Sequence, residues 1–279
     1  KCKVFASLDG VETPDLVVFG VKSYDLDTVI KKVQDAYGRD IPILSVLNGV
    51  RHLEVLRKEF TNVIFATIGF NAYRTSSIMA VATGGSLVLS SSDNEAQVVQ
   101  TLYKSIKRKV SVSLAKNPMD AAHCKLVINL GNVLLTITGF DQNRKRQLPE
   151  LQQLMANLLW EGVRVMRKKG VKEVRVPGMP PWIFLWLSKV LPSSITLPIF
   201  KKKMRFSAIN SLAQDLKSGS KETELEDING YFLKLAQKVG VAVPYNEAIY
   251  ELFKEWQQEG AQPLTPKEVL SKINSFSKR

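Results

Sequence analysis

The sequence has 279 residues, of which 45% are hydrophobic and 23% are charged, and its formal net charge is +13. This length is enough for two domains of ordinary size, and the composition is typical of a soluble globular protein and excludes a disordered or fibrous one. Two cysteines, Cys2 and Cys124, exclude a disulfide framework and suit a reducing compartment, so we expect a cytoplasmic protein. No apolar run reaches the roughly 18 residues that a spanning helix needs, so we expect no transmembrane segment and no signal peptide.

The excess of basic residues would attract nucleic acid, an anionic membrane surface or a phosphorylated small molecule. The basic residues occur in small groups, at 104–109, 144–146, 164–172 and 201–205. No zinc-finger spacing, RNA-recognition motif or basic zipper pattern accompanies these groups. We therefore expect most of them to lie on solvated surfaces and expect no nucleic-acid partner, while a specific polyanion or membrane partner stays open.

The first 117 residues alternate between strand and helix patterns, which predicts a doubly wound α/β sheet. Non-alternating, β-branched runs are typical of parallel strands that are covered on both faces, and they occur at 16–21, 41–47 and 63–70. Helices are expected at 25–37, 52–60 and 94–107, and a last strand at 110–114. Two further strand patterns, 77–83 and 86–89, flank Gly84-Gly85 and predict a hairpin.

In such a sheet, ligands bind beyond the carboxyl ends of the strands. Lys22 follows the first strand and Asn48 follows the second, so both are candidates to contact a ligand, although Asn48-Gly49 is also typical of an ordinary turn. A dinucleotide-binding sheet also begins with a G-x-G-x-x-G loop after its first strand. The sequence contains no such loop, so either the fold is a different α/β fold or the opening βαβ unit lies outside this sequence.

From residue 118 onward the strand patterns disappear, and we expect an all-α domain over 118–279. An apolar helix expected at 119–140 carries Lys125, Asn129, Asn132 and Thr136 on one stripe. Because unpaired polar groups are costly to bury, this stripe should meet either a complementary protein surface or a polar ligand. Burial lowers the pKa of a lysine, so Lys125 is a candidate acid or base.

The remaining helix signals are local ones. A helix is expected at 147–169, closed by Gly170, and further helices are expected after Thr223, Asn246 and Thr265, which are typical capping residues. The segment 176–198 is rich in proline and aromatic residues, and it could be a mobile lid, a dimer surface or a loop that covers the core.

Cysteine and histidine often form reactive or metal-binding sites, but the sequence does not predict such a site for either here. On a helix, Cys124 points about 100° away from the Lys125 stripe, which favours a buried structural thiol over a nucleophile. Neither His52 nor His123 has partners at metal-ligand spacing, so we expect no metal.

Several of these residues, taken together and in this order, resemble the motifs of the ketopantoate reductase (2-dehydropantoate 2-reductase) family. The similar segments include the two strand-end elements, the catalytic-lysine helix, a serine-containing stretch and the C-terminal signature. These are residues 21–23, 47–49, 125–129, 210–216, 223–230 and 240–246. The resemblance extends from about residue 15 to residue 256, and several separated motifs in the right order are more specific than any one of them.

The resemblance implies a Rossmann-type domain over 1–117, here without its first βαβ unit, and a helical substrate domain over 118–279. It implies NADPH-dependent reduction of the 2-oxoacid 2-dehydropantoate (ketopantoate) to (R)-pantoate, on the route to pantothenate and coenzyme A. Lys125 would be the general acid, and Glu224 would help to hold the substrate and the lysine. The substrate-binding residues that it implies are Asn129, Asn132, Ser211 and Asn48, and the cofactor-binding residues are Lys22, Asn48 and Glu224.

The sequence departs from the family pattern at some of these positions. Val133 stands where the family has a second asparagine, with Asn132 one residue earlier, and Leu47 replaces the usual glutamine. Because the glycine-rich phosphate loop is not in the sequence, NADPH is implied by the resemblance alone. A paralogous reductase of another branched 2-oxoacid stays open, as do a non-catalytic anion- or membrane-surface-binding protein and a homodimer.

Overall fold

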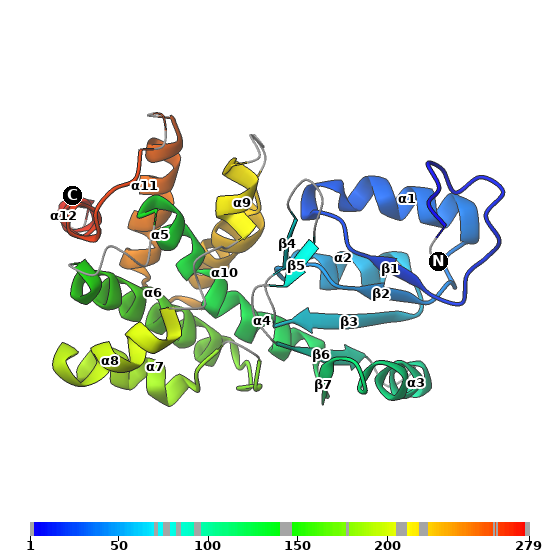
Figure 1. The fold of residues 1–279 in the computed structure, drawn as a ribbon, viewed down its shortest axis with the longest axis horizontal. Coiled ribbons are helices and arrows are strands. Elements are labelled where there is room, and N and C mark those ends of the chain that lie inside the picture. The colour runs from blue at the N-terminus through cyan, green and yellow to red at the C-terminus, as the bar shows by residue number, and fades with distance from the viewer. Residues whose placement is uncertain are drawn as a thin grey trace.

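The computed structural model describes most of the chain, in two parts that lie next to each other (Figure 1). One part is a sheet with flanking helices, and the other is a group of helices. The described residues are 3–69, 72–74, 79–81, 85–91, 96–139, 147–176, 179–204, 211–217, 223–258, 260 and 262–276.

The main sheet has five strands in the order β1-β2-β3-β6-β7. Its elements are β1 (Val17–Phe19), α1 (Leu26–Tyr37), β2 (Ile43–Ser45), α2 (Arg51–Glu59), β3 (Val63–Ile68), β6 (Ser86–Ser91), α3 (Ala96–Ile106) and β7 (Ser111–Ala115). The first three strands are parallel, β6 runs antiparallel to β3, and β7 is parallel to β6. Strand β3 is buried along nearly its whole length, as its unbroken apolar pattern predicts. The Rossmann-like α/β part that the sequence predicts is therefore present.

The predicted hairpin between 77–83 and 86–89 is wrong. Strand β5 (Met79–Val81) pairs instead with β4 (Ala72–Arg74) in a separate two-stranded sheet, while β6 pairs with β3 and β7. The apolar pattern located the strands correctly but did not determine their partners. Because β6 has a main-sheet strand on each side, it hydrogen-bonds along both edges, which a two-stranded hairpin would not allow.

In the second part, all the described secondary-structure elements between residues 118 and 276 are helices. Its elements are α4 (Pro118–Asn129), α5 (Gly131–Ile137), α6 (Leu148–Lys169), α7 (Trp182–Val190), α8 (Ser193–Met204), α9 (Ser211–Lys217), a π-helix (Glu226–Gly230), α10 (Tyr231–Val239), α11 (Pro244–Gln258) and α12 (Pro266–Phe276). Helix α6 lies at the centre and contacts α4, α5, α7, α8, α10, α11 and α12. Within the part of the chain that the structure describes, no helix combines the length and apolarity needed to cross a bilayer.

The apolar helix predicted at 119–140 forms as two segments, α4 and α5, which are interrupted at Leu130. It begins at Pro118, where the Asn117 side-chain oxygen accepts a hydrogen bond from the Met119 amide at 2.9 Å. A Cβ at Gly131 would lie 2.5 Å from Met155 Sδ on α6, so the glycine lets the Met155 side chain pack close to α5. Phe140 lies outside the described residues.

Most of the described residues of the proline-rich segment 176–198 are helical rather than part of a loop. Helix α7 follows Pro181, and α8 continues through Pro198. Both helices contact α6, through the buried side chains of Trp182 and Leu185 and through a hydrogen bond from Gln152 of α6 to Thr196.

Candidate active site

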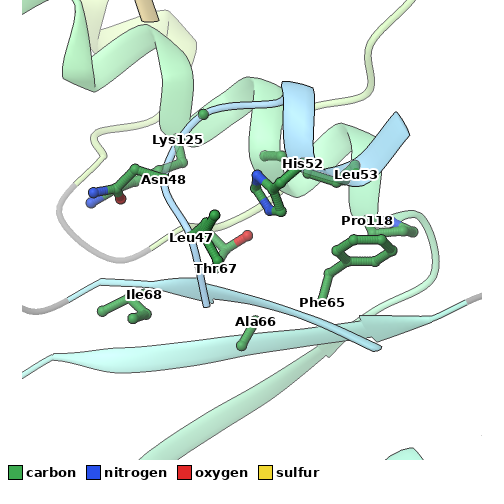
Figure 2. Close-up of a pocket in the computed structure, with 12 residues that line it drawn as sticks. Leu47, Asn48, His52, Leu53, Phe65, Ala66, Thr67, Ile68, Pro118 and Lys125 are labelled. Atoms are coloured by element: carbon green, nitrogen blue, oxygen red, sulfur yellow. The ribbon is translucent and has the colours of Figure 1, made fainter. Parts of the chain in front are cut away.

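Lys125 lies at the junction of the two parts. Its helix, α4, packs against strands β3 and β6. With Ala122 and Pro118 it forms one wall of a pocket, and the other wall comes from the loop after β2, the start of α2 and the end of β3. Figure 2 shows Asn48 and Lys125 extending toward the same side of this pocket. Residues that lie far apart in the sequence, on a strand end and on a helix, therefore meet at one site.

The Lys125 ammonium is poorly solvated in this position. Burial lowers its pKa from 10.5 to about 8, because removal of water disfavours the charged form. A lysine with this pKa carries a proton at neutral pH and releases it much more readily than an exposed lysine does. This is the property required of a general acid that operates near neutral pH.

The loop that carries Asn48 passes close to the helical part. Gly49 has a φ of 84°, in the left-handed region that favours glycine. A Cβ at this residue would lie 3.5 Å from the backbone oxygen of Asp227. The Asn48-Gly49 turn therefore lies against the segment that contains Glu224 and Asp227.

A second contact joins the same two regions. The Ser23 hydroxyl donates a short hydrogen bond to the Asp227 carboxylate, which lies on the π-helix. Lys22, half-buried, directly precedes Ser23 at the end of β1. Glu224 is buried three residues before Asp227. The ends of β1 and β2 thus lie beside the 224–227 segment, as a ligand site between the two parts requires.

His52 and Thr67 also line the pocket, although no sequence motif marks either as a site residue. Burial lowers the pKa of His52 to about 4, with a backbone hydrogen bond at Asn48 acting in the opposite direction. The ring is therefore neutral at pH 7, and it lies against Phe65 with the ring centroids 5.9 Å apart. The available signal was position, because His52 lies four residues after Asn48, at the ligand-binding end of the sheet.

The other predicted site residues do not line this pocket. Asn129 is buried at the end of α4, and Asn132 is half-buried in the first turn of α5. Ser211 is the first residue of α9, which packs against α5, and its side chain is outside the described part. Of the predicted site residues, the pocket brings together Asn48 and Lys125.

A hydrogen bond joins the Lys125 helix to α10. His123 Nδ1 lies 2.6 Å from the Met119 carbonyl oxygen, so this nitrogen carries the proton. Nε2 then accepts a hydrogen bond from the Tyr231 hydroxyl at 3.2 Å. Burial lowers the pKa of His123, which maintains the neutral form that this pairing needs.

Cys124 is buried, and burial raises the pKa of its thiol to about 11, as a structural role requires. Throughout the described ranges, no three His, Cys, Asp or Glu side chains converge in a way that could hold a metal ion.

Two family models match the chain. Residues 3–94 match "Ketopantoate reductase PanE/ApbA", and residues 117–257 match "Ketopantoate reductase PanE/ApbA C terminal". The chain belongs to the ketopantoate reductase family. The resemblance predicted from the motifs is confirmed, and the chain is accordingly an oxidoreductase.

Individual relatives are distant but cover most of the chain. A 2-dehydropantoate 2-reductase from Halobacterium salinarum is 24% identical over 264 residues, which span 90% of this chain and 78% of that protein. The solved structure of a dimeric ketopantoate reductase from Staphylococcus aureus has a TM-score of 0.69 at 20% identity, with 88% of this chain and 78% of that chain covered. A D-mandelate dehydrogenase solved with NADH and anilino(oxo)acetate has a TM-score of 0.67 at 18% identity, with 97% and 80% covered. These structural similarities confirm the Rossmann-like fold with a helical second part.

Proposed function

We propose that this protein reduces 2-dehydropantoate to (R)-pantoate with NADPH, and that Lys125 is the general acid. The observation that carries the proposal is a lysine whose pKa is lowered to about 8 and which shares a pocket with Asn48 at the ligand-binding end of the sheet. Family membership and the 2-dehydropantoate 2-reductases among its relatives support the substrate.

The residues present fit the nicotinamide end of the cofactor. Lys22 follows β1 and Asn48 follows β2. Next to Asn48, Gly49 lies close to the Asp227 backbone, where the two parts of the chain meet. Lys22, Asn48 and Glu224 would hold this end of the cofactor. When bound, a reduced nicotinamide supplies a hydride. We propose residues 1–117 as the cofactor unit and 118–279 as the substrate unit.

The chemistry assigned to Lys125 follows from charge development on the carbonyl oxygen. Hydride addition to the carbonyl carbon breaks the C=O π bond and leaves an electron pair on that oxygen. The Lys125 ammonium stabilises this charge and donates its proton, which yields the hydroxyl and a neutral amine that regains a proton from solvent. Glu224 would keep the ammonium and the substrate aligned. Asn129, Asn132, Ser211 and Asn48 would hydrogen-bond the carboxylate and hydroxyl groups of the substrate.

The test is NADPH oxidation in the presence of 2-dehydropantoate, followed at the nicotinamide absorbance. We expect turnover by the full-length protein, loss of about 10²–10⁴-fold in kcat for Lys125→Ala, and no loss for Lys116→Ala, which removes an exposed lysine. NADH in place of NADPH determines the cofactor preference. Unchanged turnover in Lys125→Ala would refute the assigned mechanism.

A second candidate substrate is another branched 2-oxoacid. Val133 at the position of a family asparagine and the similarity in fold to a D-mandelate dehydrogenase favour this alternative. A panel of 2-oxoacids compared by kcat/KM separates the two, because the alternative requires 2-dehydropantoate to be among the poorest substrates. We also propose a place in pantothenate and coenzyme A synthesis in the cytoplasm, and a homodimer, a state recorded for the Staphylococcus aureus enzyme.

A further inference from the structure

The outer face of helices α7 and α8 is unusually apolar. We define the α7–α8 surface as Ile183, Phe184, Trp186, Val190, Ile195 and Ile199, whose side chains are between 41% and 61% exposed. Seven of the twelve large hydrophobic residues that are exposed in the described part of the chain lie between residues 183 and 199. Isolated exposed apolar residues are normal, but a concentration of this kind marks an interaction surface.

This surface is separate from the candidate active site. Figure 1 places α7 and α8 along one side of α6, with α5, α9 and α11 on the other side, and the pocket lies at the junction with the sheet. Trp182 and Leu185 fill the inner side of α7, while Ile183, Phe184 and Trp186 point outward. A partner that covered this surface would leave the pocket open.

The charge carried by α7 and α8 themselves is of one sign, while the exposed Glu173 carboxylate accepts a hydrogen bond from the Trp182 amide at the start of α7. Between residues 174 and 214 the sequence contains no Asp or Glu and six basic residues. Of these, Lys189, Lys201 and Lys202 are exposed beside the apolar side chains. Exposed lysines that accompany exposed Trp, Phe and Ile are typical of a helix that lies in the interface of an anionic membrane.

The same charges disfavour a second copy of this chain as the occupant. In a two-fold dimer the same patch lies on both subunits. Lys189, Lys201 and Lys202 would then face their own counterparts with no carboxylate from this segment to pair with them. Like charges placed together in a closed interface cost several kcal/mol. Phospholipid phosphates, in contrast, complement the lysines, while the acyl region accepts the apolar side chains.

We propose that the α7–α8 surface docks this enzyme reversibly on the surface of an anionic phospholipid bilayer. Ile183, Phe184 and Trp186 enter the boundary between headgroups and acyl chains, and the lysines contact the phosphates. Because the helices lie flat on α6, the attachment is peripheral. The pocket continues to exchange its ligands with water.

The test is flotation of the full-length protein with vesicles, using phosphatidylcholine alone or mixed with phosphatidylglycerol at about two to one. We expect binding to the mixed vesicles at least tenfold stronger than to phosphatidylcholine, and weaker binding as salt is raised. Phe184→Glu with Trp186→Glu should reduce the partition coefficient more than tenfold. Phe184→Ser with Trp186→Ser is the milder second variant, and unchanged far-UV circular dichroism shows that each variant is folded.

Two matched double variants separate the effect of the α7–α8 surface on binding from the effect of net charge. Lys201→Glu with Lys202→Glu should weaken binding by about five-fold per residue or more. Lys31→Glu with Lys32→Glu changes the net charge equally on α1, at exposed positions, and should leave binding within about twofold. Equal losses in both pairs would overturn the proposal, because binding would then reflect net charge alone.

Three further results would overturn it. The first is no binding to mixed vesicles, and the second is binding that survives both apolar variants. The third is a dimer in sedimentation equilibrium that Phe184→Glu dissociates, without vesicle binding, because the surface would then be an interface between copies. NADPH oxidation is not the readout, so failure here is distinct from failure of the proposed reaction.

Discussion

Replacing Lys125 with methionine should abolish the acid catalyst and stabilise the fold at the same time. The two side chains have similar length, so the change mainly removes the charge. The pKa of Lys125 falls from 10.5 to about 8 on folding, which corresponds to about 3 kcal/mol of unfavourable free energy whenever the group is protonated in both states. Methionine carries no such penalty, so a gain of up to about 3 kcal/mol is expected at pH 7.

The sign of the pH dependence makes this prediction specific. Below pH 8 the lysine is charged in the folded and unfolded states, and the penalty is fully present. Between pH 8 and 10.5 the folded state loses its proton first, so the wild-type protein gains stability relative to Lys125→Met. Above 10.5 the lysine is neutral in both states, and the difference between the two proteins should be small.

Two measurements test the reasoning. Urea unfolding at pH 7 and pH 10.5 should show the variant more stable at the first pH and nearly equal at the second. The wild-type kcat/KM should be flat up to pH about 8 and fall tenfold per pH unit above it, while the variant loses about 10²–10⁴-fold. A variant that is less stable at pH 7, or a rate that does not decline until pH 10, would refute the account.

Three further substitutions test the roles of individual side chains. Ser23→Ala removes the hydrogen bond to Asp227. It should raise KM more than it lowers kcat, at a cost of about 1–2 kcal/mol in urea unfolding, and an unchanged KM would count against alignment of the two parts. Glu161→Ala leaves buried amides near Asn246 without an acceptor and should cost about 2–4 kcal/mol in thermal unfolding. A smaller cost would mean that water replaces the carboxylate. Asn132→Ala should raise KM about tenfold with kcat nearly unchanged, and an equal drop in kcat would reassign it to catalysis.

Local sequence signals predicted the helices well, because each signal acts within one turn of the chain. Helix α6 ends where Gly170 adopts a φ of 84°, as expected for a left-handed cap. Before α12, the Thr265 hydroxyl accepts from the Glu268 amide at 3.2 Å and the Glu268 carboxylate accepts from the Thr265 amide at 2.7 Å. This is the capping box that the sequence pattern predicts.

Interactions between distant segments could not be predicted in this way. Asn246 was expected to cap a helix, but α11 begins at Pro244 and its first amides are bound by Glu161 of α6. The Glu226 carboxylate accepts from the Tyr250 hydroxyl of α11. In both cases the partner lies far away in the sequence, and residue type alone does not identify it. The wrong partner assigned to β6 has the same cause.

The candidate site contains residues that the sequence predicts and one that it does not. Asn48 was predicted from its place after a strand, and Lys125 from a polar stripe on an apolar helix, and the structure places both in one pocket. His52 was missed because a histidine in the first turn of a helix is common. It becomes a candidate only when α2 is known to begin at this pocket.

Val133 and Asn132 show how burial resolves a question that the sequence leaves open. The family asparagine aligns with Val133, which is fully buried, whereas Asn132 is half-buried. A carboxamide in place of Val133 would enter the hydrophobic core, where an amide without a hydrogen-bonding partner costs about 1–3 kcal/mol. The chain therefore positions valine against the core and asparagine at the accessible side of α5. Of the two residues, Asn132 is the partly exposed one, so the proposed role in substrate binding falls on Asn132 rather than on Val133.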